Sequence, residues 1–178
     1  MRRFVNPGDT AFEVAVNSQI YVDKTGLLAY TNSVINTKQA LICSSRPRRF
    51  GKSITADMLC AYYSRGCDSD SIFASYEIAK SDSYKKYLNQ YDVIYLDIQW
   101  CMMDAGSAEQ TVSYLNYHVI EELKEIYPQI LPDGIRTAYG AMSCINAQTG
   151  VKFIVIIDEW DVLIRDEAAN EAVLQDYI

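Results

Sequence analysis

The sequence of 178 residues predicts an α/β fold in which a mostly parallel sheet is flanked by helices. Two continuous apolar runs, at residues 40–43 and 153–157, have the length of buried strands, and a third segment, residues 93–99, is largely apolar. Segments with apolar residues at helical spacing lie between them. Strands that are apolar at every position are typical of parallel sheets covered by helices on both faces.

The first elements in chain order are short. Residues 1–19 have mixed polarity and a Pro-Gly turn, which predicts an irregular lead-in. Residues 20–22 (Ile-Tyr-Val) are expected to form a short strand. A helix should follow through residues 27–30, capped by Asp23 or Thr25, because either side chain can accept a hydrogen bond from an unpaired amide. This segment either packs near the Gly-Lys-Ser loop described next or serves only as a structural cap.

The stretch at residues 39–61 has the order strand, polar loop, Gly-Lys-Ser, helix. The first amides of a helix lack intrahelical partners and carry the positive end of its dipole, so a polyphosphate can bind there. In such a loop Gly51 allows close backbone approach, Lys52 reaches the β- and γ-phosphates, and the Ser53 hydroxyl binds Mg²⁺. Arg46 replaces the first glycine of the usual motif, so this stretch alone also fits an ordinary strand-to-helix turn.

The middle of the chain supplies the covering helices and a second strand. Residues 68–90 predict two short surface helices, and the strand at 93–99 carries Asp97 near its end, facing either the site or solvent. Residues 107–127 predict a long helix with Ser107 and Gln110 as a capping box. Pro128 ends that helix, and residues 135–146 predict another. The single histidine, His118, has no further ligand at metal-binding spacing and is expected to be structural.

An acidic pair follows the apolar run at 153–157 directly. Carboxylates at the carboxyl end of a buried strand are costly unless they are solvated, paired or metal-bound, and ligands bind at that end of open α/β sheets. Asp158 is predicted to hold Mg²⁺ or its water shell, and Glu159 to polarise an attacking water. The alternative is that the pair only begins a polar loop, and the combination with Gly-Lys-Ser argues against it. A further helix is expected at 162–177.

Three motifs together resemble a known family. RPRRFGKS at 46–53, YVDKTGLL at 21–28 and IIDEWD at 156–161 resemble the bacterial AAA-ATPase-like family, in which arginine usually replaces the first loop glycine. The resemblance implies a P-loop NTPase that binds ATP with Mg²⁺. It implies Asp158 and Ser53 as metal ligands, and Glu159 with Lys52 as catalytic residues. The nucleotide-binding residues it implies are Arg48, Arg49, Phe50, Gly51, Lys52, Ser53 and Ile54.

Composition limits the other functions. The net charge of −7 argues against a general nucleic-acid-binding surface. Five scattered cysteines fit reduced thiols, and no apolar run is long enough to cross a membrane, so we expect a cytoplasmic protein. Fourteen tyrosines along the chain predict packing at the edges of elements rather than a base-stacking platform.

The resemblance also implies missing parts. Residues 1–178 would be the N-terminal part of such a domain, truncated before the strand that carries a polar sensor residue. We therefore expect a fragment, direct pairing of the nucleotide-binding strand with the acidic strand, or a partner that supplies the missing strand. Self-association is one consequence. The main functional hypothesis is ATP binding, with hydrolysis in the full-length protein. The alternative is a nucleotide switch that does not hydrolyse ATP and regulates a C-terminal effector domain, which in this family is often nuclease-like.

Overall fold

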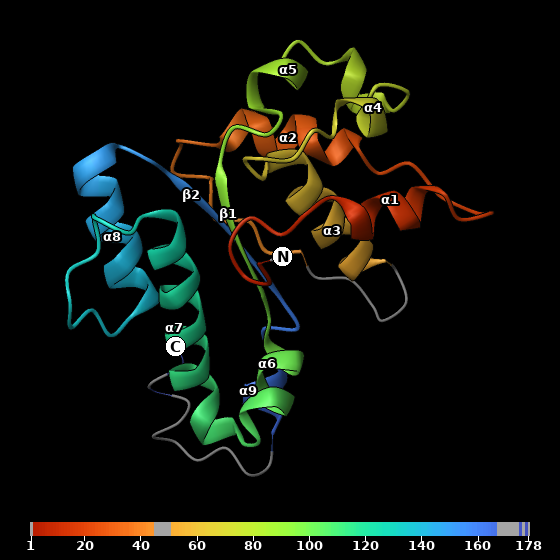
Figure 1. Cartoon of the computed structure of the whole chain (residues 1–178). Coiled ribbons are helices and arrows are strands. Elements are labelled where there is room, and N and C mark those ends of the chain that lie inside the picture. Colours follow the sequence, from red (N-terminus) through yellow and green to blue (C-terminus); the bar gives the residue numbers. More distant parts are fainter. Residues whose placement is uncertain (1, 45–50, 167–174, 176, 178) are drawn as a thin grey trace. The chain divides into compact units, whose positions relative to one another are not determined.

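The computed structural model describes residues 2–44, 51–166, 175 and 177. The chain divides into two compact units, residues 6–93 and residues 2–5 together with the chain from 94 onward. Both contain helices, and a two-stranded parallel sheet is formed by the strands labelled β1 and β2 in Figure 1. The predicted α/β class with helices around a parallel sheet is therefore confirmed, for a small sheet.

The first unit is mainly helical. In chain order it contains α1 (Thr10–Val16), α2 (Gly26–Val34), α3 (Lys52–Tyr63), α4 (Asp70–Phe73), the 3-10 helix η1 (Glu77–Lys80) and α5 (Tyr84–Tyr87). The helix expected after Gly-Lys-Ser is thus confirmed as α3. Its buried face packs against α1 and supplies Met58, Tyr62 and Tyr63 to the core.

Aromatic rings form much of this core. Phe12 of α1 stacks on Phe73 of α4 with ring centroids 5.1 Å apart, and Tyr62 meets Phe73 edge-on at 5.3 Å. Such geometries are the preferred ones for aromatic pairs. The predicted placement of tyrosines at element edges is wrong for Tyr62 and Tyr63, which are fully buried.

The two buried tyrosines keep their hydroxyls hydrogen-bonded. Tyr63 donates to Asn32 Oδ1 at 2.7 Å, and Asn32 Nδ2 donates to the Tyr62 hydroxyl at 3.0 Å. The Tyr62 hydroxyl in turn donates to the backbone oxygen of Tyr84 at 2.8 Å. Because buried polar groups are tolerated only when paired, this chain of bonds fixes α2 against α3 and α5.

Several predictions for the first unit are wrong. The lead-in is not wholly irregular, since α1 forms within it and buries Phe12 against Phe73. Residues 20–22 form no strand, and Ile20 and Val22 are exposed. Residues 40–44 form no strand either, and Leu41 is 95% exposed. Apolar character was not sufficient there, because a strand also needs a neighbour for its backbone groups, and among the described residues the sheet consists of β1 and β2.

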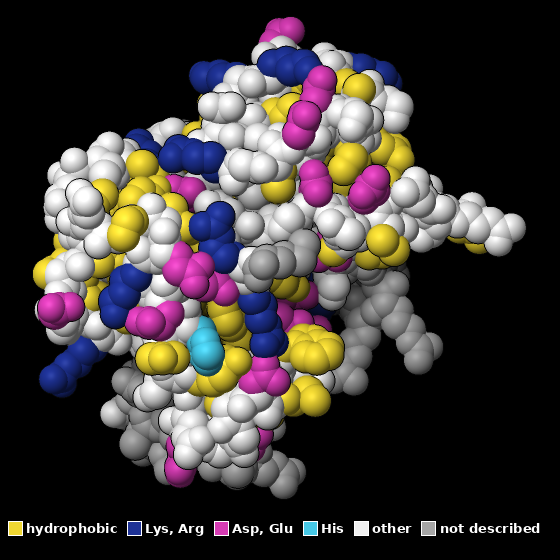
Figure 2. All heavy atoms as spheres, in the orientation of Figure 1, with side chains coloured by type: hydrophobic (Ala, Val, Ile, Leu, Met, Phe, Trp, Pro, Cys, Tyr) yellow, Lys and Arg dark blue, Asp and Glu magenta, His cyan; other side chains and the backbone are white. Residues whose placement is uncertain are grey.

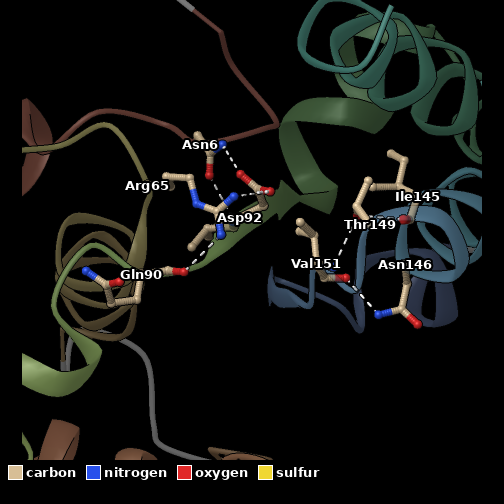
Figure 3. A network of polar contacts seen from close by, with 9 residues as sticks. Asn6, Arg65, Gln90, Asp92, Ile145, Asn146, Thr149 and Val151 are labelled. Atoms are coloured by element: carbon tan, nitrogen blue, oxygen red, sulfur yellow. Dashed lines mark hydrogen bonds and ion pairs between the residues drawn. The ribbon is translucent and has the colours of Figure 1, made fainter. Parts of the chain in front are cut away.

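A buried carboxylate marks the end of the first unit. Asp92, at the start of β1 (Asp92–Asp97), is 1% exposed and accepts a hydrogen bond from Asn6 Nδ2 at 2.7 Å. Arg65 lies 3.7 Å from the other carboxylate oxygen and donates to the backbone oxygen of Gln90, as Figure 3 shows. The guanidinium and the amide together satisfy a charge that would otherwise be costly to bury.

The second unit surrounds the rest of the sheet with longer helices. It contains α6 (Ile98–Ala105), α7 (Ala108–Ile126), α8 (Ala138–Thr149), β2 (Phe153–Asp158) and α9 (Val162–Arg165). The predicted long helix with its cap is confirmed, because the Ser107 hydroxyl accepts from the Gln110 amide at 3.3 Å. Leu115, Val119 and Leu123 of α7 are buried and pack with Ile94 and Ile145 in an aliphatic core. Figure 1 shows α8 beside α7.

The strand β2 begins after a tight turn. Gly150 has a φ of +72°, which glycine adopts without steric cost, and it ends α8. Asn146 Nδ2 donates to the backbone oxygen of Val151 at 2.8 Å, and the Val151 amide donates to the Thr149 hydroxyl at 3.1 Å (Figure 3). These bonds fix the loop between α8 and β2.

The acidic strand forms where it was predicted, but it is not buried on both faces. Val155 and Ile157 of β2 are 44% and 48% exposed. Side chains alternate between the faces of a strand, so these two residues lie on the same face. Asp158, on the opposite face, is 7% exposed.

Two smaller predictions can be compared with the described residues. No helix among them is long and apolar enough to cross a membrane. All five cysteines are free thiols, as expected, and Cys60 is buried. Cys43 is exposed, because residues 40–43 form no buried strand.

Candidate functional site

The start of α3 is the basic half of the candidate site. Gly51 is the residue before the helix and has a left-handed φ of +73°, a conformation that favours glycine. Its backbone oxygen accepts hydrogen bonds from the amide and hydroxyl of Thr55, at 3.1 and 2.9 Å. Lys52 is half-buried and Ser53 is exposed. The first-turn amides of this 12-residue helix, with an ammonium and a hydroxyl beside them, suit a polyphosphate bound with a cation.

The remaining predicted nucleotide-binding residues divide into two groups. Arg48, Arg49 and Phe50 lie outside the described residues, as does Arg46. Ile54 lies in the first turn of α3, where its amide belongs to the same set of helix-start donors as those of Lys52 and Ser53. Its side chain is 41% exposed.

The carboxyl end of β2 is the acidic half. Asp158 is 7% exposed, and its Oδ1 accepts a hydrogen bond from the Glu159 amide at 3.0 Å. Its Oδ2 is buried and has no hydrogen-bond donor among the residues that the structure describes. A buried carboxylate oxygen without a donor is costly, and a cation or a bound hydroxyl would relieve that cost.

Glu159 has an unusual backbone and a basic neighbour. Its φ is +49°, in the left-handed region that few residues other than glycine adopt, and such strain is found preferentially at functional sites. Arg165 of α9 lies 3.5 Å from its carboxylate and 2.9 Å from that of Asp161. The carboxylate of Glu159, the candidate base, is therefore partly exposed to solvent and also contacts the guanidinium of Arg165.

A third carboxylate lies at the same end of the sheet. Asp97, which ends β1, accepts a hydrogen bond from the Trp100 amide at 3.0 Å and so caps α6. Partial burial raises the pKa of Asp97, the Trp100 amide opposes this, and the negative charges of Asp158 and Glu159 raise it further. Asp97 thus faces the other acids rather than only solvent. Sequence reasoning missed its capping role because it did not predict α6, although an aspartate before an apolar helical stretch is a typical cap signal.

The acidic end fits a divalent cation of the kind that accompanies nucleotides. Mg²⁺ in such sites is usually held by one or two carboxylates together with phosphate oxygens and water, rather than by a cage of protein ligands. The unpartnered Oδ2 of Asp158 matches that requirement. No group of three His, Cys, Asp or Glu side chains suited to a metal occurs within residues 2–44 and 51–166.

The structure gives His118 a packing role. Its ring lies between Phe4, Tyr114 and Tyr117, with centroids 6.0, 4.2 and 5.1 Å away. On the face drawn in Figure 2, basic side chains are interspersed with acidic ones.

The two halves belong to different units. Gly51, Lys52 and Ser53 lie in the first, and Asp158 and Glu159 in the second. Within the second unit the structure brings Asp158 and Glu159 together with Asp97 and Arg165. No sequence signal marked Arg165 as a neighbour of Glu159, because the pairing depends on the turn between β2 and α9.

Comparison with known proteins adds the family. Neither the curated proteins nor the solved structures gave a significant match. A family model described as predicted AAA-ATPase matches residues 10–178, which includes both halves of the candidate site. The chain therefore belongs to the family of predicted AAA-ATPases.

Proposed function

We propose that this chain binds ATP together with Mg²⁺ and takes part in ATP hydrolysis. The family is consistent with ATP binding. The observation that carries the proposal is the start of α3, where a left-handed glycine is followed by Lys52 and Ser53 at the first free amides of a long helix. Those groups form a phosphate-binding arrangement in P-loop proteins.

In this proposal each half has its own role in binding the nucleotide and its cation. The amides of residues 51–54 and the ammonium of Lys52 bind the β- and γ-phosphates, and Arg48, Arg49 and Phe50 complete the loop. The Ser53 hydroxyl and the Asp158 carboxylate would hold Mg²⁺, which neutralises phosphate charge when bound. The unpartnered oxygen of Asp158 supports that role.

The reaction proposed is attack of water on the γ-phosphorus. A new bond forms between the water oxygen and the γ-phosphorus, and the bond from that phosphorus to the bridging β–γ oxygen breaks, giving ADP and phosphate. Glu159 accepts the proton of the water. Lys52 stabilises the charge that develops on the transferred group, because positioning and electrostatics provide most of the catalysis in phosphoryl transfer.

A second candidate function is a nucleotide switch without appreciable hydrolysis, which governs an attached effector domain. The observation that favours it is the 3.5 Å contact of Arg165 with Glu159. A guanidinium beside a carboxylate competes with water for its oxygens, so Glu159 would be less available to an attacking water. Tight ATP binding with negligible phosphate release by the full-length protein would distinguish the switch from the ATPase.

Thermal unfolding with and without ATP and Mg²⁺ tests the binding proposal. A ligand at one hundred times its Kd should stabilise the folded chain by about 2.7 kcal/mol. Lys52→Ala should remove that gain. Lys86→Met is the matched control, because Lys86 is an exposed cation of the same unit whose Nζ lies over the Tyr87 ring. Absence of any nucleotide-dependent gain in the unmodified protein would refute the proposal.

A further inference from the structure

The segment before α2 is anchored to another helix by its side chains. The two carboxylate oxygens of Asp23 accept hydrogen bonds from the amides of Thr25 at 2.7 Å and Glu77 at 2.9 Å. The Thr25 hydroxyl, fully buried, accepts from the Ile78 amide at 3.1 Å. These side chains therefore cap the 3-10 helix η1, whereas α2 has no side-chain cap, contrary to the prediction.

Electrostatics agrees with this anchoring. Burial alone would raise the pKa of Asp23, but the amides of Glu77 and Thr25 stabilise the charged form and hold the pKa below its ordinary value. Residues on both sides of Lys24 are thus fixed by hydrogen bonds to η1 or to each other. The backbone at Lys24 therefore has little freedom, and the position from which its side chain extends is fixed.

Lys24 extends to the start of α3. Its Nζ lies 2.9 Å from the position that a Cβ would occupy on Gly51. A side chain at position 51 would collide with this ammonium and would also be strained by the left-handed backbone. The Lys24 side chain is exposed, so a ligand at the start of α3 can reach it.

Two ammonium-bearing residues and a helix dipole therefore meet at one end of α3. Lys52 begins the helix, Lys24 approaches the residue before it, and the helix N-terminus itself carries partial positive charge. A multiply charged anion is the class of ligand that such a group of positive charges favours. A nucleoside triphosphate has that charge.

We propose that Lys24 is a second phosphate-binding lysine, which contacts the terminal phosphates of the nucleotide while Asp23 and Thr25 hold it in position. This inference rests on the proposed function, because it concerns the same nucleotide. It gives the segment at residues 21–28 a role beyond capping. The ligand class is a nucleoside polyphosphate, and affinity depends on the charge at position 24.

Calorimetric titration with ATP and Mg²⁺ tests the proposal on five proteins: the unmodified chain, Lys24→Met, Lys24→Arg, Lys86→Met and Lys52→Ala. Lys24→Met should weaken ATP binding roughly tenfold, the loss typical of one charge-assisted contact. Lys24→Arg should keep most of the affinity, and Lys86→Met all of it. Raising the salt concentration should weaken binding less in Lys24→Met than in the unmodified chain, because one screened contact is gone.

The outcomes separate the two proposals. Affinity of Lys24→Met equal to that of Lys86→Met, with binding lost in Lys52→Ala, overturns the role of Lys24 and leaves the nucleotide site standing. Failure of the unmodified chain to bind ATP overturns both. Unfolding temperatures without nucleotide are measured in parallel. Equal losses of affinity in Lys24→Met and Lys24→Arg, accompanied by a lower unfolding temperature in both, would show that the lysine supports the fold, and would overturn the proposal.

Discussion

The two halves of the candidate site carry opposite charges and differ in how completely the oxygens of their carboxylates are paired. In the basic half, both carboxylate oxygens of Asp23 and the hydroxyl of Thr25 accept backbone amides, and the segment that presents Lys24 is held without any ligand. In the acidic half, Asp158 is as buried as a core residue, yet its Oδ2 lacks a donor among the described residues.

This difference indicates which half of the site depends on a ligand for its stability. Anchors that are already hydrogen-bonded give a preorganised binding surface, and preorganisation reduces what binding costs. A buried oxygen without a partner, next to Asp97 and Glu159, instead destabilises the free protein until a cation or donor arrives. We therefore expect substitutions in the basic half to lower affinity, and substitutions at Asp158 to change the stability of the free protein as well.

The largest expected effect is on turnover. Glu159→Gln removes the proposed base, so phosphate release by the full-length protein should fall by about 10²- to 10⁴-fold while ATP affinity changes little. Glu121→Gln on α7 is the control, since Glu121 is a half-exposed residue that pairs only with Lys124 in the described contacts. Steady-state phosphate release and calorimetric affinity measure the two quantities. Unchanged turnover in Glu159→Gln would remove Glu159 as the base.

The same assay addresses the switch alternative. If the unmodified protein binds ATP but releases almost no phosphate, Arg165→Ala should raise the rate, because it frees Glu159 from the guanidinium. A rate that stays negligible in Arg165→Ala would mean that the contact with Arg165 is not what limits hydrolysis.

The next effect concerns Asp158. Asp158→Asn removes the buried charge, so the free energy of unfolding without nucleotide should stay equal or rise by about 1 kcal/mol. The stabilisation by ATP with Mg²⁺ should fall to the level measured with ATP and a chelator. Urea unfolding under the three conditions measures both. Asp161→Asn is the control, because Asp161 is partly exposed and its carboxylate pairs with Arg165. A loss of several kcal/mol in ligand-free Asp158→Asn would indicate that the carboxylate serves the fold instead.

The sequence predicted the helices better than the strands. Lys52–Tyr63 and Ala108–Ile126 form where spacing and capping residues indicated, because those signals are local to each helix. Residues 40–43 are as apolar as a strand but remain exposed and unpaired with the sheet. A strand depends on a partner distant in the sequence, and composition alone does not specify that partner.

The candidate site shows the same difference between features with a local sequence signal and features that depend on the folded structure. Gly51 and Asp158 were predicted from motifs, and the left-handed glycine and the buried carboxylate agree with the predicted surroundings. The approach of Lys24 to Gly51 and the pairing of Arg165 with Glu159 were not predictable, because each joins segments whose spatial proximity is set by packing. That Lys52 and Asp158 act on one nucleotide stays a prediction.

The smallest expected effect is a difference in pH dependence between the two halves. The pKa of Asp23 is lowered below its ordinary value of 3.8. As the pH falls below 3.8, the unfolded chain therefore binds the proton first, and the stability supplied by Asp23 is lost.

The pKa of Asp97 is raised above 3.8, mainly by burial. As the pH rises above 3.8, the unfolded chain therefore releases its proton first, and the stability of the folded chain falls. Asp23 is exposed and Asp97 is partly exposed, so solvent screens both carboxylates and each contribution should stay below about 1 kcal/mol. Urea unfolding of the Asp23→Asn and Asp97→Asn variants would measure both contributions. The measurements are made between pH 3 and pH 6, at steps of about 0.5 pH units. The deficit of Asp23→Asn should shrink as the pH falls, and the advantage of Asp97→Asn, which keeps a side-chain cap for α6, should grow as the pH rises. Parallel curves for the two variants would mean that the pKa values of Asp23 and Asp97 are not shifted in opposite directions, and the contrast between the halves would lose its electrostatic basis.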